Sequence, residues 1–353
     1  MAPLSFIVVG SGWRAMFYVR IALRYPQCFA LKYLLCRTEE KAKLICREYG
    51  IPVTTSVQAC EAAHPDLVVV AVGRNDSFPV TAEWLNKGYP VLAETPAAQT
   101  EAELEKLWAL RQAGARLQIA EQYIRYPLIA AGLRAIDRGL LGEPQAVTLS
   151  LAHDYHAVSL IRHMLRPEPG AVRLRGLAYS FPVEETDSRA GPVRDGSVMQ
   201  RPRSLAAMEF PDGKAAFYDF SGVQYHSFIR ARHINVQGPR GEWNDTTLRY
   251  VDAGHLPARE RLKPYLDPAY APLHTPELLA ISRVWQPEVH METWQDEYAI
   301  ASMLLDMGDY IRHGREVYPL AEALEDAYLW LLMDRAIKDP GPVLESQPHA
   351  WNE

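Results

Sequence analysis

Cysteine is scarce in this chain, and its scarcity limits the class of protein that the chain can be. Only four cysteines occur among 353 residues, and none of them has the C-x-x-C spacing of a zinc or redox site. They are Cys28, Cys36, Cys46 and Cys60. A disulfide framework is not expected. We predict reduced, mostly buried thiols in a cytoplasmic protein.

Long apolar runs and an excess of positive charge are also missing. No stretch of about 18 apolar residues is present, so we predict no membrane span. The first strand-like run begins at Leu4 with no basic segment before it, so we expect no signal peptide. A formal net charge of −6 does not attract a polyanion, so nucleic acid is not an expected partner.

The first 120 residues alternate short apolar runs with helical patterns. Runs such as FIVVG and DLVVVAVG are dense in Val and Ile, which is typical of parallel strands buried on both faces. The segments between them, such as TEEKAKLICREYG, carry apolar residues at helical spacing and end at glycine. The alternation predicts an α/β fold with a doubly wound parallel sheet, a Rossmann domain over residues 1–121.

The pattern changes in residues 122–353, where we predict a second α/β domain with a mixed or antiparallel sheet. SLAAMEF and KAAFYDF are strand-like runs separated by Pro-Asp-Gly, which is a strong hairpin signal. Residues 180–204 are polar and contain Pro and Gly, so we expect a loop there. Two amphipathic helices close the chain and can pack back on the Rossmann domain.

A glycine-rich motif follows the first predicted strand. GSGWRA fits G-x-G-x-x-G/A and opens a helix, which is the context that a dinucleotide site requires. Its residues are Gly10, Ser11, Gly12, Trp13, Arg14 and Ala15. Gly10 permits the tight turn, Gly12 lets the backbone approach a pyrophosphate, and Ala15 allows close helix packing. The alternative is a plain glycine turn.

The end of the second strand bears on the choice of cofactor. An acidic residue there would bind the ribose 2′-hydroxyl of NAD, but this chain has Arg37 and Thr38. Arg37 can pair with a 2′-phosphate, to which Thr38 can hydrogen-bond, or it can stack on adenine and serve either nucleotide. We predict NADP as the preferred cofactor and NAD as the alternative.

Titratable side chains gather at two places in the second half. The segment HDYH, at a strand-to-helix junction, contains His153, Asp154, Tyr155 and His156. Histidine suits proton transfer near neutral pH, and an adjacent carboxylate can orient its ring. Solvated side chains and a helix cap are the alternative. Two histidines without a clear third ligand do not predict a metal site.

The second place follows the last Rossmann strand, where an open α/β sheet presents its ligand crevice. Tyr123, Arg125 and Tyr126 are expected to line it, unless their rings only pack between the domains.

Four segments in order resemble one family. VVGSGWRA, GYPVLAETPAA, IRYPLIAAGLRAIDRGLLGEPQAV and IRARHINVQGPRGEW are together similar to the glucose-fructose oxidoreductase / inositol dehydrogenase (Gfo/Idh/MocA) family over nearly the whole chain. The resemblance implies a Rossmann domain followed by an α/β domain with a large open mixed sheet. The outer face of that sheet commonly mediates oligomer contacts, which implies a homodimer or homotetramer.

The departures from the family pattern concern the mechanism. Family dehydrogenases place a lysine in E-K-P and an aspartate four residues before a histidine. Here Thr95 stands at the lysine position and Ala152 at the aspartate position, while His156 matches the histidine. The resemblance implies cofactor contacts for Glu94, which is the E of E-K-P, and for Asn75.

We therefore expect an NAD(P)-dependent oxidoreductase that acts on a sugar, polyol or related small polar substrate. His156, with Tyr126 and Asp154, would carry acid-base catalysis, and we expect Tyr123, Arg125, His153 and Tyr155 to contact the substrate. Related thiazolinyl imine reductases, which also lack the lysine, point to a tyrosine as an alternative acid. Two other functions stay open: an NAD-dependent glycoside hydrolase or lyase with transient oxidation, and a non-catalytic NADP sensor.

Overall fold

The computed structural model describes residues 2–188, 191–284 and 293–352, and within them the chain forms two compact units. The first unit comprises Met1–Gln122, Asp267–Thr275 and Thr293–Ala327. The second comprises Tyr123–Leu266, Pro276–Glu292 and Tyr328–Glu353.

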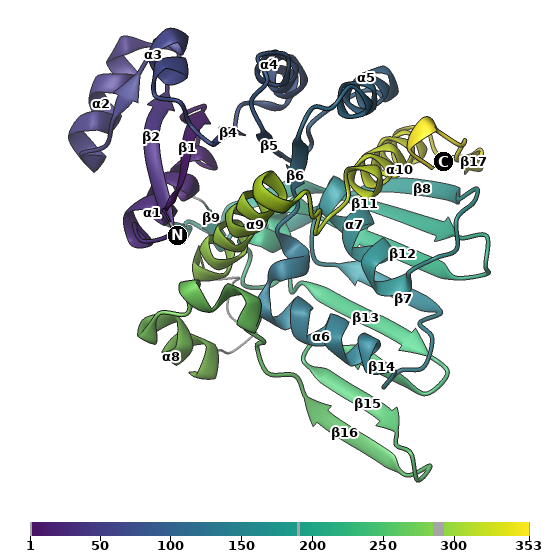
Figure 1. Ribbon diagram of the computed structural model, residues 1–353. Helices are drawn as coiled ribbons and strands as arrows, with labels where there is room; N and C mark the ends of the chain where they lie inside the picture. The colour runs from purple at the N-terminus through teal and green to yellow at the C-terminus, as the bar shows by residue number, and fades with distance from the viewer. Residues whose placement is uncertain (1, 189–190, 285–292, 353) are drawn as a thin grey trace. The chain divides into compact units, whose positions relative to one another are not determined.

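A six-stranded parallel sheet forms the centre of the first unit (Figure 1). Its strands are β1 Leu4–Val9, β2 Phe29–Leu35, β3 Val53–Thr54, β4 Leu67–Val70, β5 Val91–Glu94 and β6 Leu117–Ala120. The order β3-β2-β1-β4-β5-β6 reverses its winding between β1 and β4, as in a Rossmann domain. All residues of β4, β5 and β6 are buried, which explains their nearly continuous apolar sequence. The predicted Rossmann fold is confirmed.

Helices connect these strands, and short polar side chains begin several of them. The helices are α1 Ala15–Arg24, α2 Glu39–Tyr49, α3 Val57–Ala62, α4 Arg74–Asn86, α5 Glu101–Gln112 and α9 Thr293–His313, with the 3-10 helix η3 Pro268–Leu273. Thr38, Ser56 and Thr100 cap α2, α3 and α5 by accepting a backbone N–H of the first turn. Helix α9 is bound to α1 through Glu297, which accepts from Arg20 Nε at 2.7 Å.

A nine-stranded mixed sheet dominates the second unit. Its order is β16-β15-β14-β13-β7-β12-β11-β8-β17, in which only β7 and β12 pair in parallel. The strands are β7 Ala146–Ser150, β8 Arg173–Glu184, β11 Val198–Glu209, β12 Ala215–Phe220, β13 His233–Gly238, β14 Gly241–Asn244, β15 Thr247–Val251, β16 Pro257–Arg261 and β17 Leu344–Glu345. The predicted large mixed sheet is confirmed, and β16 and β17 form its two edges.

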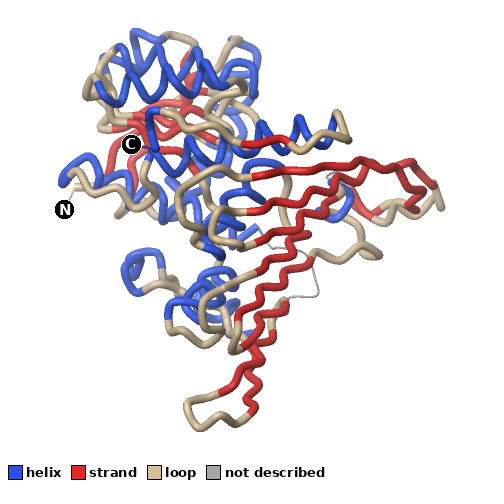
Figure 2. Tube along the Cα trace, turned by 90° about the vertical axis from the view of Figure 1, so that its right-hand side faces the viewer, coloured by secondary structure: helices blue, strands red, loops and turns tan. Residues whose placement is uncertain are grey.

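Helices α6 and α7 lie on one face of this sheet (Figures 1 and 2). The helices of the unit are η1 Tyr123–Arg125, α6 Pro127–Asp137, α7 Asp154–Leu165, η2 Gly222–Tyr225, α8 Pro276–Val284 and η4 Ala350–Asn352. Helix α10, Leu320–Lys338, belongs to the first unit up to Ala327 and to the second thereafter.

The expected loop at residues 180–204 is wrong in part. Strand β8 continues to Glu184 and β11 begins at Val198, so that about half of the interval consists of these two paired strands. Among the described residues between them lies the short pair β9 Asp187–Ser188 and β10 Gly191–Pro192. The polar composition misled the prediction because these strand ends are exposed and need no apolar side chain.

All four cysteines are free thiols. Cys36 and Cys60 are buried, whereas Cys28 is half-buried and Cys46 is exposed, so the expectation of mostly buried thiols holds for two of the four. Burial raises the pKa of the Cys60 thiol to about 11. Among the described residues, no helix has both the length and the apolar character that a bilayer crossing requires.

Close packing between α6 and the sheet depends on a glycine. Trp243 of β14 is fully buried, and its Nε1 donates to the backbone oxygen of Asp245 at 2.6 Å. A Cβ atom at Gly132 would lie 2.3 Å from the indole ring of Trp243. The absence of a side chain at Gly132 therefore lets the helix lie directly on the indole.

We expect Gly132→Ala to lower the free energy of unfolding by about 1–3 kcal/mol, although alanine is the better helix former, because the indole must move. Denaturant unfolding measures the change. In a Trp243→Phe background the same substitution should cost much less, because the smaller ring leaves room. Equal costs in both backgrounds would contradict the packing argument.

Candidate functional site

The turn after β1 has the geometry that a nucleotide loop requires. Gly10 has φ +118°, and a Cβ there would lie 2.2 Å from the backbone oxygen of Ala71, which follows β4. No other residue fits this close approach. At Gly12 a Cβ would meet no atom within 4 Å, so the N-terminus of α1 opens onto free space. This arrangement fits a pyrophosphate at the helix N-terminus.

Arg14 lies in a partly buried charge network inside the first unit. Its guanidinium is 3.7 Å from Glu94 and 3.8 Å from Asp296 of α9, and it donates to the amide oxygen of Gln122 when that amide is turned to satisfy both of its ends. Glu94 also accepts from the Tyr18 hydroxyl at 2.6 Å. Burial and the Glu94 carboxylate raise the pKa of Tyr18 well above its usual value, so that Tyr18 keeps the proton that it donates.

The carboxyl ends of β2 and β4 carry the side chains predicted to select the cofactor. Arg37 is largely exposed, and its Nη1 lies 3.4 Å from Asp76 Oδ2. Thr38 caps α2 by accepting from Lys41 N at 3.4 Å, which leaves its hydroxyl proton available to a ligand. Asn75 is exposed in the first turn of α4. The carboxyl ends of parallel strands lie along the same side of the sheet, so these groups lie on the same side as Gly10.

The remaining predicted cofactor contacts also lie at the carboxyl ends of the parallel strands. The Ser11 side chain hydrogen-bonds the Cys36 thiol. Trp13 is 57% exposed, and its ring meets the edge of Phe17 at 4.7 Å between centroids. Thr95 is half-buried directly after β5, and its peptide bond to the following proline is cis. A threonine hydroxyl there can hydrogen-bond a ligand but carries no charge.

In the second unit, four predicted residues come together as one group of rings. The Tyr123 ring is 4.7 Å from that of Tyr126 and 4.6 Å from that of His156. The two imidazoles of His153 and His156 are 5.4 Å apart and nearly perpendicular. His156 is buried, while His153 is half-buried at the N-cap of α7. Tyr123 from η1, Tyr126 from the N-cap of α6 and the two histidines from the start of α7 thus meet.

Sequence reasoning missed a fifth ring in this group. Tyr225, the last residue of η2, places its hydroxyl 2.5 Å from His153 Nδ1 and accepts the backbone N–H of His153 at 3.1 Å. The Tyr123 hydroxyl donates to the same oxygen at 3.3 Å. No local signal marks Tyr225, because its contacts are with residues that lie 72 and 102 positions earlier.

The other predicted residues of this region have different surroundings. Asp154 begins α7 with φ +52°, a strained backbone for a residue other than glycine, and its charge acts on the Tyr218 hydroxyl. Tyr155 is almost fully buried, with its ring 6.0 Å from that of His156. Arg125 is half-buried in η1. In the part of the chain that the structure describes, no group of three or more His, Cys, Asp or Glu side chains could hold a metal ion.

Comparison with known proteins gives a family for the first domain and a fold for the whole chain. Residues 4–121 match the family described as "Oxidoreductase family, NAD-binding Rossmann fold" (GFO_IDH_MocA). Among curated proteins, none matches the chain.

Solved structures similar to the chain cover almost its full length at low identity. An oxidoreductase from Agrobacterium radiobacter in complex with NAD+, L-tartaric acid and magnesium has a TM-score of 0.72 at 14% identity, over 97% of this chain and 98% of that one. Levoglucosan dehydrogenase with NADH and levoglucosan has a TM-score of 0.70 at 15% identity, over 95% and 97%. Biliverdin reductase from Synechocystis, with biliverdin and NADP+, has a TM-score of 0.64 at 15% identity, over 96% and 100%.

The family match and the geometry of the glycine turn point the same way. Gly10 and Gly12 provide the close turn and the open helix end, and the strand order reverses beside them, which is where open α/β sheets bind their ligands. Residues 4–121 therefore form an NAD-binding Rossmann domain that matches the Gfo/Idh/MocA oxidoreductase family, and the chain is an NAD(P)-dependent oxidoreductase.

Proposed function

We propose that this protein transfers a hydride to or from a sugar, a polyol or a related small polar substrate. The observation that carries the proposal is the ring group of the second domain, in which imidazoles and phenols offer several N–H and O–H groups within hydrogen-bonding reach of one another. Such groups suit a substrate rich in oxygen. The relatives that bind levoglucosan and L-tartaric acid agree with it, whereas the biliverdin reductase shows that the fold alone does not dictate the substrate.

His156 is the proposed acid-base group, and Tyr126 is the second choice. The nicotinamide nucleotide, when bound, supplies the hydride chemistry, so that the protein has to orient the substrate and move one proton. An imidazole is a side chain that can both donate and accept a proton, and the Tyr123 and His153 rings pack against that of His156. Thr95 cannot take this role, because a hydroxyl is not a neutral-pH acid. The role proposed for Asp154 is electrostatic, in that its carboxylate charge acts on the site without transferring the proton.

NADP is the proposed preferred nucleotide. Arg37 extends from the end of β2 and is paired only loosely with Asp76, in an exposed contact of 3.4 Å. Exposed pairs contribute little free energy, so Arg37 can turn to a 2′-phosphate at small cost. Asp76 then lies near the 2′-phosphate, and the repulsion between the two negative charges limits the preference for NADP over NAD.

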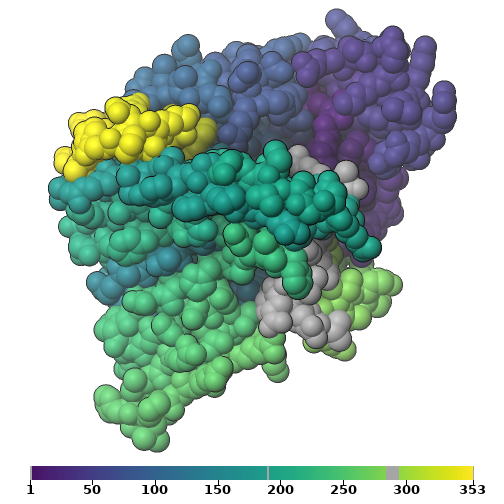
Figure 3. Space-filling view, turned by 180° about the vertical axis from the view of Figure 1, so that it is seen from behind, coloured from purple at the N-terminus to yellow at the C-terminus, as the bar shows by residue number. Residues whose placement is uncertain are grey.

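We also propose that the protein is a homodimer or homotetramer through the open face of the nine-stranded sheet. Four large apolar side chains form a patch on this face, and we call them the sheet patch. They are Leu177, Tyr179 and Phe181 of β8 and Phe217 of β12. Each is between 46% and 51% exposed. Figure 3, seen from behind, shows the strand residues of β8 and β11 at the surface. A second copy would remove this apolar area from water.

The hydride-transfer proposal is tested by incubating the protein with NADP+ or NAD+ and a set of polar substrates that includes levoglucosan, myo-inositol and L-tartrate. Net formation of reduced nicotinamide is the expected result. Turnover without net reduction would favour the hydrolase or lyase that oxidises its substrate transiently. Nucleotide binding without hydride exchange on any substrate would favour the sensor.

Cofactor preference is tested with Arg37→Gln, which removes the charge and keeps a polar side chain. Loss of one charge-assisted contact should weaken NADP binding by roughly 10- to 100-fold and change NAD binding little. Asp76→Asn should act in the opposite direction on NADP. Calorimetric titration measures both, and tighter binding of NAD than of NADP by the unaltered protein would refute the preference.

His156→Gln should lower single-turnover hydride transfer by roughly 10²–10⁴ while the nucleotide dissociation constant stays nearly unchanged, because glutamine cannot exchange a proton. Thr95→Ala is the comparison and should cost much less. Near-normal turnover in His156→Gln would move the assignment to Tyr126, for which Tyr126→Phe is the matching variant.

The oligomer is tested by light scattering, where we expect a multiple of 39.8 kDa at micromolar concentration. Tyr179→Glu should reduce the mass to that of one chain, because burying a carboxylate in the interface is unfavourable. Val251→Glu is the control, since Val251 is exposed on β15, outside the sheet patch. A single-chain mass for the unaltered protein would end this proposal.

A further inference from the structure

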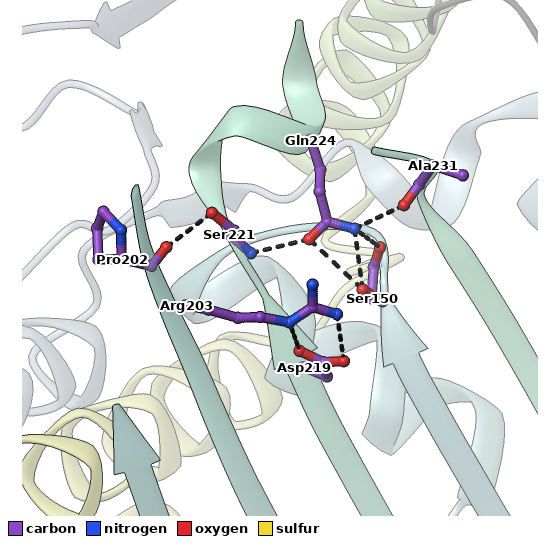
Figure 4. Close-up of polar contacts among 7 residues, drawn as sticks. All are labelled: Ser150, Pro202, Arg203, Asp219, Ser221, Gln224 and Ala231. Carbon is purple, nitrogen blue, oxygen red and sulfur yellow. Dashed lines mark hydrogen bonds and ion pairs between the residues drawn. The ribbon is translucent and has the colours of Figure 1, made fainter. Parts of the chain in front are cut away.

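The short helix η2, which carries Tyr225, is fixed by its own cap. The Ser221 backbone N–H donates to Gln224 Oε1 at 2.8 Å, and the two residues form a reciprocal capping box. Ser221 Oγ also donates to the backbone oxygen of Pro202 on β11 at 2.7 Å (Figure 4). Hydrogen bonds of Ser221 and Gln224 therefore fix the turn after β12 at both ends.

Gln224 joins this turn to the strand that leads to His153. Its Nε2 lies 3.0 Å from Ser150 Oγ, at the end of β7, and donates to the backbone oxygen of Ala231 at 2.7 Å (Figure 4). Gln224 is buried, so water does not compete for these contacts. Because Ser150 lies three residues before His153 and Gln224 directly precedes Tyr225, the amide sets the separation of the two rings.

The Tyr225 hydroxyl has three hydrogen-bonding neighbours, and its one proton and two lone pairs can be assigned so that all three contacts are hydrogen bonds. A hydroxyl has one proton to donate and two lone pairs. The backbone N–H of His153 can only donate, and it occupies one lone pair at 3.1 Å. The Tyr123 hydroxyl donates to the other at 3.3 Å. The proton of Tyr225 then points to His153 Nδ1, at 2.5 Å.

The chemistry of the two groups favours the same direction. A phenol is a better donor than a neutral imidazole N–H, and an imidazole nitrogen without a proton is a better acceptor than a phenol oxygen. Burial raises the pKa of Tyr225, so the hydroxyl keeps its proton at neutral pH.

We propose that Tyr225 is a positioning residue that holds neutral His153 in the tautomer with its proton on Nε2, so that His153 offers a fixed N–H donor to an oxygen of the substrate. Gln224 is the second positioning residue, because it places the hydroxyl. The tautomer itself does not depend on the proposed function, whereas the role toward a substrate rests on it.

The proposal narrows the chemical class of the substrate. A fixed N–H donor selects an oxygen that accepts a hydrogen bond, as in a carbonyl, hydroxyl or carboxylate group, and disfavours an ammonium group at that place. When a hydride is added to a carbonyl carbon, negative charge develops on its oxygen, and a fixed donor stabilises that charge. His153 gives up no proton in this role, and the proton is moved by His156.

The tautomer is measured by ¹⁵N NMR of the full-length protein labelled on histidine, since the two imidazole nitrogens have different shifts in each neutral tautomer. His153→Gln identifies the signals of His153 among those of 11 histidines. We expect the Nε2–H tautomer to dominate at a pH where His153 is neutral. A dominant Nδ1–H tautomer, or an even mixture, in the unaltered protein would overturn the proposal without any variant of Tyr225.

Tyr225→Phe keeps the ring and removes the hydroxyl, and it should shift His153 toward a mixture of tautomers. Tyr328→Phe is the matched control, because Tyr328 is also a buried tyrosine of the second unit whose hydroxyl accepts a backbone N–H, that of Gln347, at 2.8 Å. An unchanged tautomer in folded Tyr225→Phe would refute the assignment.

The substrate role has a separate readout. With a substrate that the protein oxidises, Tyr225→Phe should raise KM by roughly 3- to 10-fold and leave the nucleotide dissociation constant unchanged. If none of the tested substrates is oxidised, the proposed function fails while the NMR result stands. If KM does not change, the role of His153 toward the substrate is refuted while the tautomer assignment stands.

Discussion

The amide of Gln224 makes hydrogen bonds to three separate stretches of the chain, and the geometry of the ring group depends on them. A side-chain amide can donate and accept at once, so one buried residue can join the end of β7, the turn after β12 and the segment before β13. An apolar side chain of similar volume would leave several buried backbone and hydroxyl groups without partners, which is costly. The histidine and tyrosines lie on different elements, and this amide brings them to fixed separations.

The first domain reaches its geometry through a different constraint. There the backbone of Gly10 contacts the backbone of Ala71, and no side chain intervenes. Steric exclusion thus shapes the nucleotide half, whereas directed hydrogen bonds shape the ring group. The difference agrees with the roles proposed for the two regions, since a phosphate is bound by any suitably open set of backbone N–H groups, while proton transfer requires particular atoms at particular distances.

The sequence predicted those features that depend on local patterns. Apolar runs and a glycine turn located the Rossmann sheet and the helix that follows Gly12. The resemblance to the family's histidine motif singled out His156, and the titratable segment HDYH singled out His153. The pairing of Arg37 with Asp76 was not predictable, because the two residues lie on neighbouring connections that only the sheet order brings together. Tyr225 was missed for the same reason. Residues 180–204 were misjudged because exposed strand ends can be polar on both faces, which removes the alternation that identifies a strand.

The two edges of the nine-stranded sheet bear on how the protein avoids uncontrolled aggregation. Edge strand β17 is only two residues long, and the opposite edge strand, β16, begins with a proline and carries Arg259, Glu260 and Arg261, all but one of its residues being exposed. Short, charged and proline-containing edges are poor templates for strand addition. Strand addition is therefore disfavoured at the β16 edge, whereas at the other edge β17 pairs only with Arg173 and Leu174 and leaves the rest of β8 as the outermost strand.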